Sequence, residues 1–303
     1  MDNSIIVERL QSHVRVLCSD IGSRSIQEPR NLARAQVYIH ERFTEYGLDV
    51  RVQDYEAFGT PTVNLIAFQP DTDLDSPLWL LGAHYDTVMG TPGADDNASA
   101  VAVMLETARI LATDIGTSPP GVLFAAFSTE EPPSFNTEYM GSRIFVSSLK
   151  TERLAIQGAL ILEMVGYYRD EPGTQQIPLT VKWMGFPNTA NFIAVVGNGR
   201  SRSLVKEVSR GIIDSDCGLP VEDLTIPGSG KLLPEARLSD NASFWDARIP
   251  AVMITDTSFF RNPYYHTHCD TPETLDYEKM GQLVRGLTHF FRKNREEGIE
   301  NAE

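Results

Sequence analysis

The 303-residue chain has few cysteines, a small share of basic residues and no long apolar run. Its three cysteines, Cys18, Cys217 and Cys269, are far apart and none forms a CxxC pair, so the sequence predicts neither a disulfide framework nor a thiolate metal site. No stretch approaches the roughly 18 apolar residues of a membrane helix. The first residues resemble an amphipathic helix rather than a signal peptide. We therefore expect a cytoplasmic protein that does not bind membranes.

Basic residues are outnumbered by acidic ones, 26 to 41, which gives a formal net charge of −15. Nucleic-acid binding requires clustered lysine and arginine, so this charge argues against DNA or RNA as a partner. Surplus acid is common in soluble proteins and needs no further explanation. A second interpretation is that some carboxylates form a metal site and attract the cationic amine of a substrate.

Short apolar runs bounded by turn residues recur along the sequence. They lie at 64–68, 78–83, 122–127, 159–162, 192–196 and 251–255. Runs of this kind are typical of strands buried on both faces. Helical spacing of apolar residues is found at 31–46, 98–111, 204–213 and 277–291. The alternation predicts an α/β fold with a largely parallel or mixed sheet, as one domain over residues 1–303. The Gly- and Pro-rich stretches 166–178 and 218–235 are interpreted as loops at a pocket rim.

The first polar motif follows the run 78–83, where His84 and Asp86 are two residues apart. At a strand end this spacing places both side chains on the same side. The carboxyl end of a strand is a favoured position for a ligand site. Asp86 can accept a hydrogen bond from one ring nitrogen of His84 and leave the other for a metal. The alternative is a loop histidine with an incidental acidic neighbour.

Two pairs of adjacent acids occupy similar places. Asp95-Asp96 precedes the helix at 98–111, and Glu130-Glu131 follows the run 122–127. A helix cap explains one acid of the first pair but not both, and a carboxylate there can bridge two metals. Adjacent acids repel each other unless a cation or solvent compensates. In the second pair, one carboxylate can bind metal while the other takes a proton from water; the alternative is a solvated turn.

The last two strand ends add further donors. Glu163 ends an apolar run, and a buried carboxylate requires a partner, either a metal or an arginine. His266 and His268 follow the run 251–255, and either histidine can serve as a ligand. Ligand-capable residues at five strand ends form a much stronger pattern than any one of them alone.

In this order, the motifs resemble those of the two-zinc aminopeptidase family, which includes bacterial leucyl aminopeptidases, glutamate carboxypeptidases and glutaminyl cyclases. The matching motifs are His84-Tyr-Asp86, Gly93-Ala-Asp-Asp96-Asn-Ala-Ser, Glu130-Glu131, Glu163-Met and His266-Thr-x-x-Asp270-Thr. The resemblance covers nearly the whole chain. It implies a three-layer α/β/α sandwich around a mostly parallel mixed sheet, similar to other zinc exopeptidases.

The resemblance also implies a role for each matching residue. The implied ligands of two Zn²⁺ ions are His84, Asp96, Glu131, Glu163 and His266, with Asp96 shared by both ions. Other divalent transition metals suit the same donors. Glu130 is the implied general base, and Asp86 is the partner that orients His84. His268 falls on a variable position and is expected to be a bystander.

Three positions depart from the family pattern. Ala100 stands where the family usually has glycine, and Asn241 stands where histidine is more common. A longer insert that begins with Pro132-Pro133 follows Glu131. We expect the change at Ala100 to be tolerated at a helix start, whereas Asn241 and the insert are expected to alter the pocket.

The function expected from these motifs is hydrolysis of amino-terminal peptide bonds, on peptides or aminoacyl substrates with a free amine. Three alternatives remain open at this point. The first is a glutaminyl-cyclase-like acyltransferase that works with one zinc. The second is a non-catalytic binding protein on a peptidase fold, which the complete ligand set disfavours. The third is a hydrolase of non-peptide amides or of carboxy-terminal residues.

Overall fold

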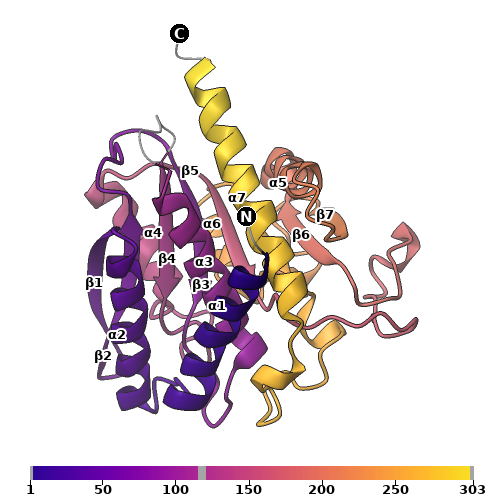
Figure 1. Ribbon diagram of the computed structural model, residues 1–303, viewed down its shortest axis with the longest axis horizontal. Helices are drawn as coiled ribbons and strands as arrows, with labels where there is room; N and C mark the ends of the chain where they lie inside the picture. The colour runs from indigo at the N-terminus through magenta and orange to yellow at the C-terminus, as the bar shows by residue number, and fades with distance from the viewer. Residues whose placement is uncertain (1–2, 115–120, 301–303) are drawn as a thin grey trace.

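A mixed β-sheet forms the centre of the computed structural model, which describes residues 3–114 and 121–300 (Figure 1). Within these residues the sheet has eight strands in the order β1-β2-β4-β3-β5-β8-β6-β7. The strands are β1 (Asp49–Ala57), β2 (Thr60–Phe68), β3 (Leu78–His84), β4 (Val122–Phe127), β5 (Ile156–Glu163), β6 (Ile193–Asn198), β7 (Val221–Ile226) and β8 (Ala251–Thr255).

The four central strands β4, β3, β5 and β8 run parallel to one another. Strand β2 is antiparallel to β4, and β6 is antiparallel to β8, so the sheet is mixed. The carboxyl ends of the four parallel strands lie along one edge of the sheet. That edge is where the polar motifs follow the apolar runs, because each run is a buried strand and each motif begins where its strand ends.

Helices cover both faces of the sheet. They are α1 (Asn3–Arg15), α2 (Pro29–Glu45), α3 (Ala100–Ala112), α4 (Gly141–Glu152), α5 (Arg202–Asp214), α6 (Asn241–Asp246) and α7 (Tyr277–Glu300). Alternate strand residues divide between two apolar cores: Leu160 and Leu162 pack with α1, α2, α3, α5 and α7, whereas Ala159 and Ile161 pack with α4 and α6. The predicted three-layer α/β/α sandwich is therefore confirmed (Figure 1).

The structure corrects the prediction in one segment and extends it in two others. Strand β7 lies inside 218–235, which we expected to be a loop. Its central residues Glu222 and Asp223 interrupt the apolar pattern, because β7 is an edge strand and is only partly buried. Helices α4 and α6 were not predicted. No helix in the described part of the chain is long and apolar enough to span a bilayer.

Candidate metal centre

The predicted ligands converge at the carboxyl edge of the parallel strands. His84 and Glu163 are the last residues of β3 and β5, and Glu131 follows shortly after the end of β4. Asp96 lies in the short helix η2 (Ala94–Ser99), which precedes α3. His266 comes from the loop after β8, and its side chain is 32% exposed, whereas the other four are almost fully buried.

One group of donors contains His84, Asp96 and Glu163. The Nε2 atom of His84 is 3.4 Å from Oδ1 of Asp96 and 3.3 Å from Oε2 of Glu163. The three donor atoms all lie within 4.8 Å of one another. The fully buried His84 has no hydrogen-bond partner on either ring nitrogen, although a buried polar atom usually has one. Its Nε2 atom is therefore free to bind a cation.

A second group contains Asp96, Glu131 and His266. The Nε2 atom of His266 is 3.1 Å from Oδ2 of Asp96 and 3.5 Å from Oε2 of Glu131. These donors also lie within 4.8 Å of one another. Asp96 thus belongs to both groups, with Oδ1 facing one histidine and Oδ2 facing the other. A carboxylate in this position can bridge two metal ions.

The spacing of the donors suits zinc. Tetrahedral zinc with ligands at about 2.0–2.1 Å requires donor atoms roughly 3.3 Å apart. The four histidine–carboxylate separations in the two groups, between 3.1 and 3.5 Å, agree with this value. Imidazole and carboxylate are also donors that zinc prefers in catalytic sites. The residues present therefore fit a metal in each group.

The electrostatics of the centre favour a bound cation. Burial together with the nearby Asp96 carboxylate raises the pKa of Glu131 to about 8. Burial alone would lower the pKa of His266, but its contacts with Asp96 and Glu131 raise it to about 10. Burial opposes protonation of His84 as well, yet Glu163, Asp86 and Asp96 raise its pKa well above the ordinary value. Carboxylates packed this closely require a neighbouring positive charge. Metal ions would supply it in place of the protons that Glu131, His84 and His266 otherwise retain.

Glu130 is part of neither group. Its Oε2 atom is 4.0 Å from Nε2 of His84, and its Oε1 atom is buried without a hydrogen-bond partner. Burial and repulsion from Glu131 and Glu163 raise its pKa well above the ordinary value, although His84 acts in the opposite direction. The side chain is thus held at the centre but is not used as a donor by either group.

Two aspartates bind the backbone of the two acidic pairs, Glu130-Glu131 and Asp95-Asp96. The carboxylate of Asp86 accepts hydrogen bonds from the backbone N–H groups of Glu130 and Glu131, at 3.0 and 3.1 Å. Asp270 accepts the corresponding bonds from Asp95 and Asp96, at 2.9 and 3.1 Å. The Nδ1 atom of His84 is 3.4 Å from Asp86, which is longer than a normal hydrogen bond. Positioning the second acidic pair is therefore a task of Asp86 that its sequence spacing did not reveal.

Further contacts tie the ligand-bearing segments together. The side chain of Asn97 donates to the Leu162 carbonyl and accepts from the Met164 N–H, so it links η2 to the end of β5. Ser239 donates to Oε2 of Glu163 at 2.6 Å. His266, one of the predicted ligands, has a φ of 56°, in the left-handed region, as does Met164 at 47°. Left-handed backbone in residues other than glycine is often found at functional sites.

Arg24 braces the loops under the centre, although it lies far from the motifs in sequence. Its side chain is completely buried and donates to five backbone carbonyls. The acceptors are Leu17, Gly22, Tyr85, Pro92 and Gly93, at 2.8 to 3.1 Å. Because Tyr85 follows His84 and Gly93 precedes η2, Arg24 fixes two ligand-bearing segments relative to each other. No feature of the sequence around Arg24 pointed to this role.

The remaining predicted positions can also be located. His268 is exposed and belongs to neither donor group. Ala100 is the first residue of α3 and is buried there. Asn241 begins α6, and its side chain donates to the Ala236 carbonyl in η5 (Pro234–Arg237), so it acts on the shape of a neighbouring loop rather than on the donor groups.

Comparison with known proteins agrees with this geometry. A family model described as peptidase family M28 matches residues 64–291. The chain is 38% identical to the uncharacterized protein YfbL of Escherichia coli, over 92% of this chain and 86% of that protein. It is 26% identical to leucine aminopeptidase 1 of Paracoccidioides brasiliensis, over 68% of this chain. The chain spans only about half (49%) of that aminopeptidase.

Solved structures share the fold at low sequence identity. LapA aminopeptidase of Legionella pneumophila has a TM-score of 0.71 at 21% identity, over 95% of this chain and 72% of its own. BSAP, a zinc aminopeptidase from Bacillus subtilis, has a TM-score of 0.73 at 17% identity and is covered to 95% in both chains. A glutaminyl cyclase of Porphyromonas gingivalis has a TM-score of 0.70 at 18% identity, over 95% of this chain and 98% of its own. The family match covers most of the sequence and includes the strands that carry the donors, and the chain belongs to peptidase family M28.

Proposed function

We propose that the protein is a two-zinc aminopeptidase, which hydrolyses the first peptide bond of substrates with a free amino terminus. The observation that carries the proposal is the position of Asp96, whose two oxygens face two separate histidine–glutamate pairs. His84, Asp96 and Glu163 would hold one zinc, and Asp96, Glu131 and His266 would hold the other. We place this activity in a single catalytic domain formed by residues 1–303.

Zinc bound at both sites would supply Lewis acidity, which makes water more acidic and stabilises the negative charge that develops on the scissile carbonyl. The task of Glu130 is to take a proton from the attacking water and return it to the leaving amine. Its geometry suits the task, because Glu130 reaches the centre and has one unpartnered oxygen there. Asp86 keeps this carboxylate in place through the backbone N–H of Glu130.

The groups at the centre explain a requirement for a free amine. The centre holds three acidic ligands, Asp96, Glu131 and Glu163, and the general base Glu130, so a free amine can contact a zinc ion or one of these carboxylates, whereas the amide nitrogen of an N-blocked peptide offers neither a charge nor a basic lone pair. Recognition of the amine would place the first peptide bond, rather than an internal one, next to Glu130. The cut is therefore expected one residue from the amino terminus.

A second candidate is cyclisation of amino-terminal glutamine with one zinc. The likeness to the Porphyromonas gingivalis glutaminyl cyclase over 98% of that chain favours it. The presence of a second complete donor group, formed by Asp96, Glu131 and His266, favours the peptidase. Metal stoichiometry and the reaction product distinguish the two candidates.

The test combines metal analysis with a substrate panel. We expect two zinc ions per chain, cleavage of aminoacyl amides and no cleavage of their N-acetylated forms. Glu130→Gln is expected to keep both ions while kcat falls by roughly a hundredfold or more, as for loss of a general base. Asp96→Ala is expected to lose metal. The exposed Glu56→Gln, on the edge strand β1, is the control and should behave like the wild type.

Other outcomes have definite meanings. Unchanged turnover in Glu130→Gln would remove this residue from the general-base role. Retention of both ions in Asp96→Ala would contradict the bridging assignment. One ion per chain, with cyclisation of glutaminyl peptides and no release of amino acids, would replace the proposed function by the second candidate.

A further inference from the structure

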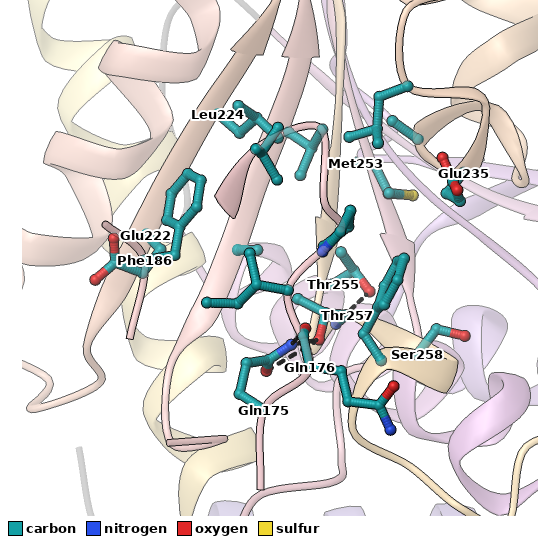
Figure 2. A pocket seen from close by; sticks show the side chains of 18 of the residues that line it. Gln175, Gln176, Phe186, Glu222, Leu224, Glu235, Met253, Thr255, Thr257 and Ser258 are labelled. Carbon is teal, nitrogen blue, oxygen red and sulfur yellow. Dashed lines mark hydrogen bonds between the residues drawn. The ribbon is translucent and has the colours of Figure 1, made fainter. Parts of the chain in front are cut away.

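A large pocket opens next to the candidate metal centre (Figure 2). The space between its lining residues is about 910 Å³ when the part open to solvent is included. Glu163 lines it at one end, together with Tyr265, whose ring stacks on His266 with 3.7 Å between the ring centroids. The pocket is therefore continuous with the centre, on the face of the sheet that carries α4 and α6.

The register of the sheet defines the floor of the pocket. Glu163 on β5 pairs with Thr255 on β8, which pairs with Ala194 on β6, which pairs with Glu222 on β7. Paired residues point to the same face, so one row of side chains leads from the metal centre to the edge strand. Strands are about 4.8 Å apart, which places the Cα atoms of Glu163 and Glu222 roughly 14 Å apart. The two residues between them are small, which leaves room for a ligand.

The walls of the pocket are apolar. The next row of the floor consists of Met253, Val196 and Leu224, and Phe186 covers it from the loop between β5 and β6. Figure 2 shows Phe186 beside Glu222 on one side of the pocket and Glu235 beside Met253 on the other. Apolar walls of this kind suit the methylene groups of a long side chain.

The charged groups of the pocket are all of one sign. Among the described residues that line it there is no lysine, arginine or histidine. Glu222 is half-buried, and burial together with repulsion from Asp223 raises its pKa. The Oε2 atom of Glu235 is buried and has no hydrogen-bond partner in the described structure. Beyond Glu163, the acidic residues of the lining are Glu222, Asp223 and Glu235, and no described lysine, arginine or histidine of the lining neutralises them. The Glu222 carboxylate lies at the outer side of the pocket (Figure 2).

We propose that this pocket binds the amino-terminal side chain of the substrate and selects lysine or arginine, with Glu222 and Glu235 as the specificity-determining residues. This inference rests on the proposed aminopeptidase function and adds its substrate class. The aliphatic stem of a basic side chain packs against the apolar walls, and its charged end meets a carboxylate at the far side. A leucine side chain is too short to reach Glu222 and leaves both carboxylates unpaired.

The experiment compares each basic substrate with a neutral one of similar length. Wild-type kcat/KM is measured for arginyl and citrullinyl amides and for lysyl and norleucyl amides. We expect each basic substrate to be preferred by roughly tenfold to a hundredfold, the range for a hydrogen bond between charged groups. Calorimetric binding of free arginine and citrulline to the zinc-loaded protein gives a readout that does not depend on turnover, and the same order is expected.

Substitutions of Glu222 and Glu235 test whether these two residues cause the preference for basic side chains. Glu222→Gln and Glu235→Gln each reduce the ratio of kcat/KM for the arginyl amide to that for the citrullinyl amide, and the double variant brings this ratio close to one. Glu56→Gln, which removes the same charge from the opposite edge strand, is the matched control and keeps the wild-type ratio.

Failure of the inference differs from failure of the proposed function. Efficient cleavage of leucyl and norleucyl amides with no preference for arginine or lysine would overturn the inference and leave the aminopeptidase in place. A basic preference that persists in the double variant would also overturn it. Absence of hydrolysis for every aminoacyl amide, with no arginine binding, would overturn both.

Discussion

Each pair of adjacent acids at the centre is positioned by one further aspartate, which binds the backbone of the pair. Asp86 and Asp270 each accept two consecutive backbone N–H groups, one pair from Glu130 and Glu131 and the other from Asp95 and Asp96. Adjacent acids would otherwise be pushed apart by their own charges. Fixing the backbone beneath each pair lets two neighbouring carboxylates take different directions.

Asp86→Asn tests this arrangement. The amide keeps one oxygen acceptor, so only one of the two N–H groups can remain bonded, and the position of Glu130 or Glu131 relaxes. We expect kcat/KM to fall by roughly tenfold to a hundredfold, the usual effect of losing a residue that supports a metal ligand. Zinc content and the melting temperature are measured alongside. Full activity in the variant would mean that the backbone of the pair holds its position without Asp86.

At the scale of helices and strands, the sequence predicted the elements that follow a simple apolar pattern. The bounds of β4 and β8 agree with the prediction, because both strands are buried throughout. The edge strand β7 was not predicted, because the adjacent acids Glu222 and Asp223 are typical of a loop and only the pairing with β6 shows that they belong to a strand. Helix α6 has only six residues, too few for a periodic signal.

Helices α1 and α3 are joined by a buried polar cluster on the side of the sheet away from the pocket. Glu106 of α3 accepts from Arg9 of α1 at 2.8 Å and from Arg109 of its own helix at 2.8 Å, and it lies 3.3 Å from His13. Burial opposes ionisation of Glu106, but the bonds with His13, Arg109 and Arg9 lower its pKa from 4.5 to about 2. The carboxylate therefore stabilises the folded state as an anion.

The sign of the pH effect follows from this lowered pKa. The stabilisation from Glu106 is complete above the unfolded pKa of 4.5 and is lost as the pH falls from there towards 2. Glu106→Gln is expected to lower the free energy of unfolding at pH 7 by about 3 kcal/mol, at about 1.36 kcal/mol per pKa unit. The gap between variant and wild type, measured by urea unfolding, should shrink below pH 4.5. A constant gap from pH 7 to pH 3 would contradict an ionic role for this cluster.

For the whole molecule, the order of the motifs allowed the candidate donors to be predicted but not the surroundings that position them. The five donors follow buried strands or precede a helix, so their convergence follows from the parallel arrangement of β3, β4, β5 and β8. Arg24 holds the loops beside the centre through the Tyr85 carbonyl, and Ser239 contacts Glu163, although both come from segments that are distant from the motifs in sequence. Such contacts depend on how loops pack, which no local pattern specifies. The pocket walls were likewise predicted only as loops at a rim.

The centre joins segments from most of the chain, so metal binding is expected to stabilise the fold as a whole. An ion whose free concentration is about a thousand times its dissociation constant contributes roughly 4 kcal/mol, which corresponds to a melting temperature roughly 6 °C higher for a domain of this size. Chelation should therefore lower the melting temperature by about this amount or more, and added zinc should restore it. Magnesium should not restore the melting temperature, because it prefers oxygen donors in an octahedral arrangement, whereas both groups contain a histidine.

In Asp96→Ala the chelator should cause little further change in the melting temperature, because both donor groups share this residue. Identical melting curves of the wild type with and without chelator would contradict a metal at this position.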